Sequence, residues 1–270
     1  MASSYHPTPL HPPPRLAVDV GCGTGIWTME MAAEIPSCHW YGIDMCDVQP
    51  PTYIAPNATF ELQDFRQGLG YQDETIDYVH QQGLTLSLPV KDWIQLLHEY
   101  RRILRKGGWV EIVETDWRLL RTGPYGDRIN EWVRAAARYR HIDVRRCRAI
   151  PEMLDDLGFT DSQRTTISLP MGTWGQRIGE MAMDNLIETL EALQPWILAA
   201  GCCNESSWNE VLDGWKDECS SHQTFLNAKV YWAKKGRSKS EGSKSGGSKS
   251  SGSKSGSSIS SPTSSADLSV

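Results

Sequence analysis

Short hydrophobic runs alternate with amphipathic stretches along the first 115 residues. The run at 16–20 (LAVDV) is typical of a buried strand, and 26–34 (IWTMEMAAE) predicts a helix that stops before Pro36. Residues 90–104 carry hydrophobic side chains at the spacing of one helix face, and Gly107 and Gly108 are expected to end that helix. Further strands are expected at 40–44, 59–64, 76–80 and 109–113. Strands that alternate with helices predict an α/β fold with a doubly wound, mainly parallel sheet.

The pattern is weaker after residue 115. It predicts helices at 125–140 and 149–158, a strand at 163–169, helices within 176–219 and a closing strand at 225–233. The second half of the chain is therefore expected to add helical insertions to the sheet.

The two ends of the chain differ in composition from the part between them. Residues 1–15 are rich in proline, which disfavours a helix there. Residues 237–270 form a Ser/Gly/Lys repeat with few hydrophobic side chains, so they are expected to be disordered. We therefore expect a Pro-rich segment at 1–15, one folded domain at 16–236 and a disordered tail at 237–270.

Charge and composition exclude several classes of protein. The net charge is −6, and because the tail holds five basic and two acidic residues, residues 1–236 carry −9. An acidic body argues against nucleic acid as a partner, since phosphate contacts need a surplus of Lys and Arg. No run approaches the roughly 18 apolar residues of a membrane helix, and the start lacks a signal peptide's apolar core. We therefore expect a soluble protein of the cytoplasm or nucleus. The 7 scattered cysteines lack a CxxC pair, which argues against a zinc site or a disulfide framework.

A glycine-rich turn joins the first predicted strand to the first helix. In a doubly wound sheet this turn lies where ligands bind, and Gly21, Gly23 and Gly25 let the backbone approach a ligand closely. The spacing is GxGxG and not the GxGxxG of dinucleotide-binding proteins. Asp19, just inside the strand, suits a ligand that carries an ammonium group and no phosphate.

Two more acidic residues end the next two predicted strands. Asp44 ends the second, where a carboxylate can accept both ribose hydroxyls of an adenosine. Asp64 ends the third, and with Phe65 it provides the acceptor and the ring face that an adenine requires. A single acid at a strand end is usually just solvated, but three on successive strands favour a nucleoside site.

The chain resembles the class I S-adenosylmethionine-dependent methyltransferases over residues 16–236, and it resembles the fungal LaeA-like methyltransferases of secondary metabolism more closely than the class as a whole. The stretches that carry the resemblance are VDVGCGTGIW (18–27), IDYVH (76–80), VKDWIQLLHEYRRILRKGGWVEIVETD (90–116) and WGQRIGEMA (174–182). The resemblance implies a Rossmann-like sheet, mostly parallel with an antiparallel closing strand, and helical insertions over the acceptor site. It also implies S-adenosyl-L-methionine as cofactor and a small-molecule methyl acceptor.

The resemblance also implies contacts of particular residues with the cofactor. They are Asp19, Gly21 and Gly23 for the methionine part, with Gly25 in the same turn, Asp44 for the ribose, Met45, Asp64 and Phe65 for the adenine, and His80 and Gln81 near the sulfonium. Related enzymes carry one or two helices before the first strand that fold over the cofactor, whereas only fifteen residues precede Leu16 here. Either this lid is missing or another segment closes the site.

A methyltransferase also needs a site for the methyl acceptor. A general base is needed only if the acceptor carries a proton of high pKa, and the candidates are His80, Glu114, Asp116 and His141. Most tryptophans lie beyond the fifth strand, and aromatic walls suit a flat, apolar metabolite. We predict that the acceptor pocket is lined by Trp117, Tyr125, His141, Met171 and Trp174, and that Trp208, Trp215 and Trp232 fill core.

Two functions from different classes are compatible with these observations. The first is a methyltransferase acting on a small metabolite in a fungal-type biosynthetic pathway. The second is a regulatory protein that uses the methyltransferase fold to bind protein partners. A third hypothesis, an NAD-dependent oxidoreductase, is disfavoured because the glycine spacing is not that of dinucleotide-binding proteins.

Overall fold

Seven strands form one sheet in the order β3-β2-β1-β4-β5-β7-β6. The computed structural model describes residues 6–47 and 54–236, so the predicted disordered tail lies outside the described residues. The strands are β1 (Leu16–Val20), β2 (His39–Asp44), β3 (Ala58–Leu62), β4 (Ile76–Gln82), β5 (Leu104–Leu120), β6 (Phe159–Pro170) and β7 (Phe225–Lys235). Strands β1 to β5 pair in parallel, and β7 runs antiparallel between β5 and β6. The predicted fold class is confirmed, including the antiparallel closing strand.

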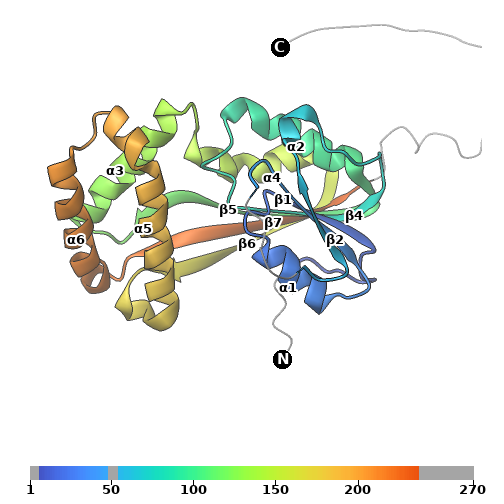
Figure 1. The fold of residues 1–270 in the computed structure, drawn as a ribbon, viewed down its shortest axis with the longest axis horizontal. Helices are drawn as coiled ribbons and strands as arrows, with labels where there is room; N and C mark the ends of the chain where they lie inside the picture. Colours follow the sequence, from blue (N-terminus) through green and yellow to red (C-terminus); the bar gives the residue numbers. More distant parts are fainter. Residues whose placement is uncertain (1–5, 48–53, 237–270) are drawn as a thin grey trace, which may run out of the picture. The chain divides into compact units, whose positions relative to one another are not determined.

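The helices cover both faces of this sheet and form a separate group beside it. They are α1 (Ile26–Glu34), α2 (Val90–Ile103), α3 (Pro124–Tyr139), α4 (Ile150–Asp156), α5 (Gln176–Ala199) and α6 (Glu205–His222), with short 3₁₀ helices η1 (Phe65–Gln67), η2 (Val144–Ala149) and η3 (Thr173–Gly175). Figure 1 shows α1 on one face, α2 and α4 on the other, and α3, α5 and α6 gathered beyond the strands. Among helices in the described part of the chain, none has the length and apolar character to cross a membrane.

Side chains of β1 alternate between two cores, as the pleat of a strand requires. Ala17 packs with Trp40 and Tyr78 on the α1 side of the sheet. Val18 and Val20 belong to the larger core under α2 and α4. The glycine turn therefore follows a strand that is buried on both faces, which fixes its position.

A third core holds α3, α5 and α6 together. Trp132 of α3 and Trp208 of α6 stack with ring centroids 5.0 Å apart, and Trp215 is fully buried beside them. Trp232 of β7 is also buried, so all three tryptophans predicted to fill core do so.

The predicted role of the Gly107–Gly108 pair as a helix end is wrong. Helix α2 ends at Ile103, and β5 begins directly at Leu104. Gly107 has φ +78°, and the pairing of β5 with β4 shifts register between Ile76 and Tyr78, so the glycines form an irregularity inside the strand. A Cβ on Gly108 would lie 2.8 Å from the carbonyl oxygen of Asp77, which explains why glycine stands there.

The described part of the Pro-rich segment packs against the sheet. Leu10 joins the core on the α1 side, and Thr8 is buried. The backbone N–H of Thr8 donates to Oε2 of Glu111 on β5 at 3.2 Å, and the Thr8 hydroxyl contacts the same oxygen. Thr8 of the Pro-rich segment therefore supplies hydrogen-bond donors to the buried carboxylate of Glu111.

Candidate functional site

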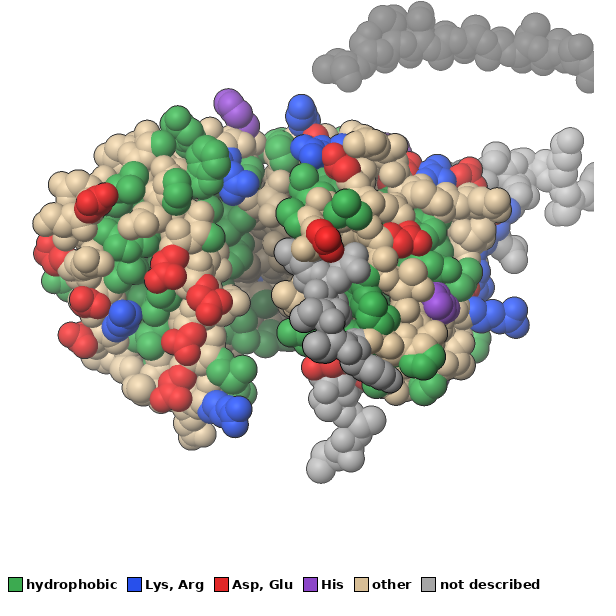
Figure 2. All heavy atoms as spheres, in the orientation of Figure 1, with side chains coloured by type: hydrophobic (Ala, Val, Ile, Leu, Met, Phe, Trp, Pro, Cys, Tyr) green, Lys and Arg blue, Asp and Glu red, His purple; other side chains and the backbone are tan. Residues whose placement is uncertain are grey.

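A cleft separates the sheet from the helical group. The carboxyl ends of β1, β2 and β4 meet at one edge because these strands are parallel, whereas β5 continues past that edge toward α3. Figure 2 shows the surface hollowed between the part of the molecule around α1 and the group of α3, α5 and α6. In open α/β sheets this edge is where ligands bind.

The glycine turn lies at this edge in a conformation that favours glycine. Gly21, Gly23 and Gly25 have φ of +74°, +52° and +77°, in the left-handed region where a Cβ is unfavourable. A Cβ on Gly21 would lie 2.5 Å from Leu84, whereas a Cβ on Gly23 would have no atom of the described residues within 4 Å. Gly23 therefore borders open space, and its missing side chain leaves room for a ligand next to the backbone.

Asp44 links the end of β2 to this turn. Its Oδ2 accepts a hydrogen bond from the N–H of Gly23 at 3.0 Å, and its Oδ1 accepts one from the N–H of Cys46 at 2.9 Å. The side chain is partly exposed. Each carboxylate oxygen has a second lone pair, so Asp44 can still accept hydroxyl groups of a ligand.

The residues expected around an adenine lie just beyond β2 and β3. Asp64 caps η1 and pairs with Arg66, with 2.8 Å between Oδ2 and Nη2; hydrogen bonds from Arg66 lower the pKa of Asp64. Strand β3 ends at Leu62, two residues earlier than predicted, because Asp64 begins this 3₁₀ turn. Phe65 is partly buried against the core, and Met45 is 53% exposed.

Asp19 and His80 form a buried pair beneath the turn. Oδ1 of Asp19 lies 2.8 Å from Nδ1 of His80, and Oδ2 accepts the hydroxyl of Thr28 at 2.7 Å. The His80 ring stacks on Trp27 with centroids 3.4 Å apart. Asp19 is 2% exposed and His80 is 1% exposed. Both side chains are therefore buried beneath the turn that they support.

Glu114 holds the loop that follows β4. Its Oε1 accepts from Nε2 of Gln81 at 2.6 Å and from the N–H of Leu84 at 2.8 Å. Its Oε2 accepts from the N–H and the hydroxyl of Thr85 at 3.0 and 2.6 Å. Burial raises the pKa of Glu114, against the effect of these hydrogen bonds. Gln81 also accepts from the hydroxyl of Tyr100 at 2.7 Å and is fully buried.

Asp116, the third candidate base, is also held by a partner. Its Oδ2 lies 2.5 Å from Nη2 and 2.8 Å from Nε of Arg148. The Asp116 side chain is 9% exposed and that of Arg148 is 44% exposed. The three candidate bases His80, Glu114 and Asp116 are therefore each hydrogen-bonded to other residues of the fold.

The residues expected to line an acceptor pocket are distributed over the helical group. Trp117, Tyr125 and Met171 all pack in its core, and Tyr125 fits against Gly214 of α6. Trp174 is 39% exposed, and its Nε1 donates to the carbonyl of Thr224 at 3.1 Å. His141 follows α3 and is exposed. His141 and Trp174 thus do not join the other three in that core.

Sequence reasoning missed one glycine and one hydrophobic residue at the edge of the sheet. Gly83 follows β4 and has φ +76°, and within the part of the chain that the structure describes a Cβ there would have no atom within 4 Å. Leu84 lies against Gly21 and fixes the distance between the two loops. Gly83 directly follows β4, and β4 lies next to β1, the strand that precedes the glycine turn. This position is the signal that could have identified Gly83.

Cys22 lies in the glycine turn but is not suited to act as a nucleophile. Burial raises the pKa of its thiol to about 12, and the carboxylates of Asp19 and Asp44 contribute to the shift. The thiol is therefore neutral at physiological pH, and the chemistry of the site rests on its backbone and carboxylates.

Comparison with known proteins gives the same fold and a specific set of relatives. The chain is 30% identical over 200 residues to the secondary metabolism regulator LAE1 of Cochliobolus heterostrophus, covering 69% of this chain and 64% of the relative. It is 31% identical over 175 residues to the protein-methionine methyltransferase laeA of Emericella nidulans, covering 62% and 46%. The chain thus spans about half to two thirds of the length of the curated relatives that it matches.

A solved structure with the same fold is a phosphoethanolamine N-methyltransferase 2 of Haemonchus contortus in complex with S-adenosylhomocysteine. The TM-score is 0.52 at 18% identity, over 83% of this chain and 49% of that one. A family profile described as a methyltransferase domain matches residues 5–163, which include the glycine turn, Asp44 and β5. On this match, together with the sheet order, the chain belongs to the methyltransferase-domain family.

Proposed function

We propose that this protein is an S-adenosylmethionine-dependent methyltransferase that methylates a small, aromatic or apolar secondary metabolite. The observation that carries the proposal is the contact between Asp44 and Gly23. Gly23 has a left-handed backbone conformation, borders open space and donates its N–H to Asp44. The carboxylate of Asp44 still has lone pairs that can accept ribose hydroxyls.

The residues at the edge of the sheet fit this cofactor. Gly23 and Gly83 leave backbone accessible without a side chain in the way. Asp44 would accept the ribose hydroxyls, and Asp64 with Phe65 would hold the adenine once the exposed side chain of Arg66 yields. When bound, the cofactor supplies an electrophilic methyl group on a sulfonium.

The remaining task of the chain is to hold an acceptor in line with that methyl group and to exclude water. We infer positioning roles for the candidate bases. His80 orients Asp19 below the turn, and Glu114 orients the loop at Leu84 and Thr85. An acceptor that ionises easily, such as a phenol, would need no further base from the protein.

Calorimetric titration of the full chain with S-adenosylmethionine and S-adenosylhomocysteine tests the proposal. We expect binding of both, and a loss of affinity for Gly23→Ala because a Cβ would occupy the space that the ligand needs. Gly201→Ala is the matched control, since Gly201 also has a left-handed φ, +69°, and open space around it, but lies between α5 and α6. Folded chain that binds neither compound would refute the proposal.

A second function is favoured by the relatives. Those at about 30% identity are described as regulators of secondary metabolism, and one as a protein-methionine methyltransferase. The same fold could thus act on, or through, a protein partner. Mass spectrometry distinguishes the two functions. A metabolite that is one methylene lighter when the gene is removed supports the first, and a missing methyl group on a captured protein supports the second.

A further inference from the structure

A second concave site lies on the outer face of α3. Its cavity has a volume of about 580 Å³, within the range of roughly 300–1,000 Å³ typical of small-molecule pockets. It is lined by residues of α3, by residues 142–145 and by Cys202 of the loop between α5 and α6. None of the residues around the glycine turn lines it.

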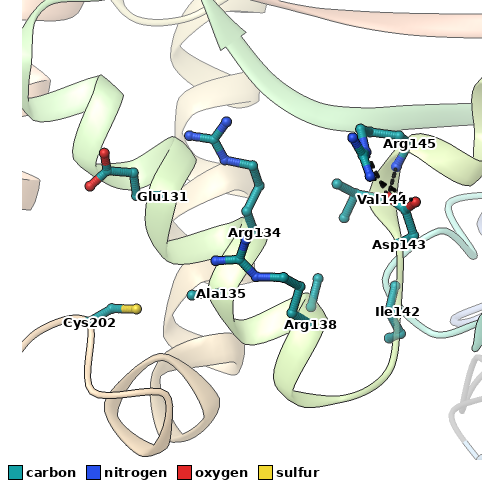
Figure 3. Close-up of a pocket in the computed structure, with 10 residues that line it drawn as sticks. Glu131, Arg134, Ala135, Arg138, Ile142, Asp143, Val144, Arg145 and Cys202 are labelled. Carbon is teal, nitrogen blue, oxygen red and sulfur yellow. Dashed lines mark hydrogen bonds and ion pairs between the residues drawn. The ribbon is translucent and has the colours of Figure 1, made fainter.

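The helix period explains why arginines face this cavity. Ile129, Trp132, Val133 and Ala136 turn one side of α3 into the core shared with α5 and α6. Arg134 and Arg138, four residues apart, therefore lie together on the opposite side. Figure 3 shows both side chains extending from α3, with Arg145 on the segment across the cavity.

The guanidinium groups of this cavity have few partners of their own. Arg134 uses only Nε, which donates to the carbonyl of Asn130 at 3.0 Å. Arg145 donates to both carboxylate oxygens of Asp143, from Nε to Oδ1 at 3.0 Å and from Nη2 to Oδ2 at 3.3 Å. Among the described residues, the side chain of Arg138 has no hydrogen bond or ion pair. Arg134 and Arg138 thus differ from Arg102 and Arg148 elsewhere in the fold, which are each held by carboxylates.

The charge of this region is opposite to that of the body. The charged residues that line the cavity are Arg134, Arg138 and Arg145 against Glu131 and Asp143, a balance of +1, although residues 1–236 carry −9. Arginines placed close together repel one another unless an anion lies between them. Guanidinium groups bind phosphate and carboxylate groups through paired N–H donors. Apolar atoms of Ala135, Ile142 and Val144 line the same cavity and provide contact for a hydrocarbon or aromatic body.

We propose that this cavity is a binding site for a small organic anion, in which a phosphate or carboxylate group binds to Arg134, Arg138 and Arg145 and an apolar body packs on the residues between them. The concave shape and the apolar part of the lining favour a small molecule over an extended protein surface. The site is separate from the methyltransferase cleft, so the proposal does not depend on the activity of that cleft.

Calorimetric titration of the full chain with phenyl phosphate, benzoate and phenol tests this inference. We expect the two anions to bind and neutral phenol not to bind. The double variant R134Q/R138Q is expected to raise the dissociation constant at least about tenfold, the loss of one charged contact or more. R177Q is the matched control, since Arg177 is an exposed arginine of α5 outside the cavity. Its dissociation constants are expected to equal those of the unchanged chain.

The arms of this experiment separate the sources of the anion. Tighter binding of phenyl phosphate assigns a phosphorylated ligand, and tighter binding of benzoate assigns a carboxylate; either supports the site. Equal affinity of the unchanged chain and R134Q/R138Q would overturn it, as would equal binding of phenol. An acidic peptide that binds when both small anions fail would also overturn it, in favour of a protein partner. Binding of S-adenosylhomocysteine, measured in parallel, should be the same in all variants.

Discussion

The carboxylate of Asp19 on β1 and the imidazole of His80 on β4 lie side by side, with 2.8 Å between Oδ1 and Nδ1. The register of the sheet requires this, because Asp19 and His80 are direct partners of the parallel strands. A pair of buried polar groups is costly to separate, since each is then left in a site without water. The pair therefore stabilises the start of the glycine turn from below.

Replacing His80 should destabilise the fold more than replacing an exposed histidine. His80→Ala leaves the buried carboxylate of Asp19 with Thr28 as its remaining partner and removes the ring stacked on Trp27. We expect a loss of about 2–4 kcal/mol in the free energy of unfolding, measured by urea denaturation. His98→Ala, at an exposed position of α2, should change it by less than about 0.5 kcal/mol. Equal effects of the two substitutions would contradict the structural role of the pair.

Asp44 should be required for cofactor affinity. In Asp44→Ala, ribose hydroxyls lose their acceptor and Gly23 loses the hydrogen bond that holds its N–H. At about 1–3 kcal/mol for each unpaired group, calorimetry should show S-adenosylhomocysteine binding at least about tenfold more weakly. Asp47→Ala serves as the control, because Asp47 is exposed on the same turn. If Asp44→Ala bound as tightly as that control, the ribose would lie elsewhere.

Most of the fold could be predicted because hydrophobic periodicity reports burial directly. Strand β1 and helix α1 have the predicted bounds, since LAVDV is buried on both faces and IWTMEMAAE is closed by Pro36. The bounds of β5 were missed for a physical reason. Its first residues continue the helical pattern of α2, and its last follow Trp117, whose φ of +52° interrupts the pairing with β7.

The candidate site was predictable in position but less so in the direction of its side chains. Strand ends identify the edge at which Asp19, Asp44 and Asp64 gather, because parallel strands end together. They do not reveal that Asp19 points under the turn, since that depends on Thr28 and His80 as partners. The partners of Glu114 likewise come from the loop at Leu84 and Thr85, and no local pattern relates the two segments.

The contribution of Glu114 to stability should decrease as pH rises. Burial raises the pKa of its carboxyl in the folded state above the ordinary value of 4.5. Between those two values the folded chain binds more protons than the unfolded chain, so the free energy of unfolding falls with increasing pH. The stabilising effect is complete below the ordinary pKa and is lost as pH passes the raised one.

Glu114→Gln isolates this effect from other titrating groups. We expect the difference in unfolding free energy between the unchanged chain and Glu114→Gln to decrease as pH rises above the ordinary carboxyl pKa of 4.5, measured by urea denaturation at each pH. A difference that grows with pH would mean that the hydrogen bonds from Gln81, Leu84 and Thr85 outweigh the effect of burial.

Gly179 should be intolerant of any side chain because of a close backbone contact. It lies within WGQRIGEMA, the stretch that is similar to LaeA-like proteins, and a Cβ there would lie 2.2 Å from the carbonyl oxygen of Gly172. The N–H of Gly172 also donates to the carbonyl of Gly179 at 2.9 Å. Gly179→Ala would force α5 away from the turn that enters η3, where backbone cannot give way as a flexible side chain can.

We expect Gly179→Ala to lower the free energy of unfolding by about 1–3 kcal/mol or more, measured by urea denaturation. Gly70→Ala is the matched control, since its Cβ would meet only the flexible side chain of Gln63 at 3.4 Å. That substitution should change stability by less than about 1 kcal/mol. Because α5 is part of the helical group beside the cleft, acceptor turnover of Gly179→Ala should fall more than its affinity for S-adenosylhomocysteine. Unchanged stability of Gly179→Ala would show that α5 can shift without cost. The close contact with Gly172 would then not explain the glycine in WGQRIGEMA.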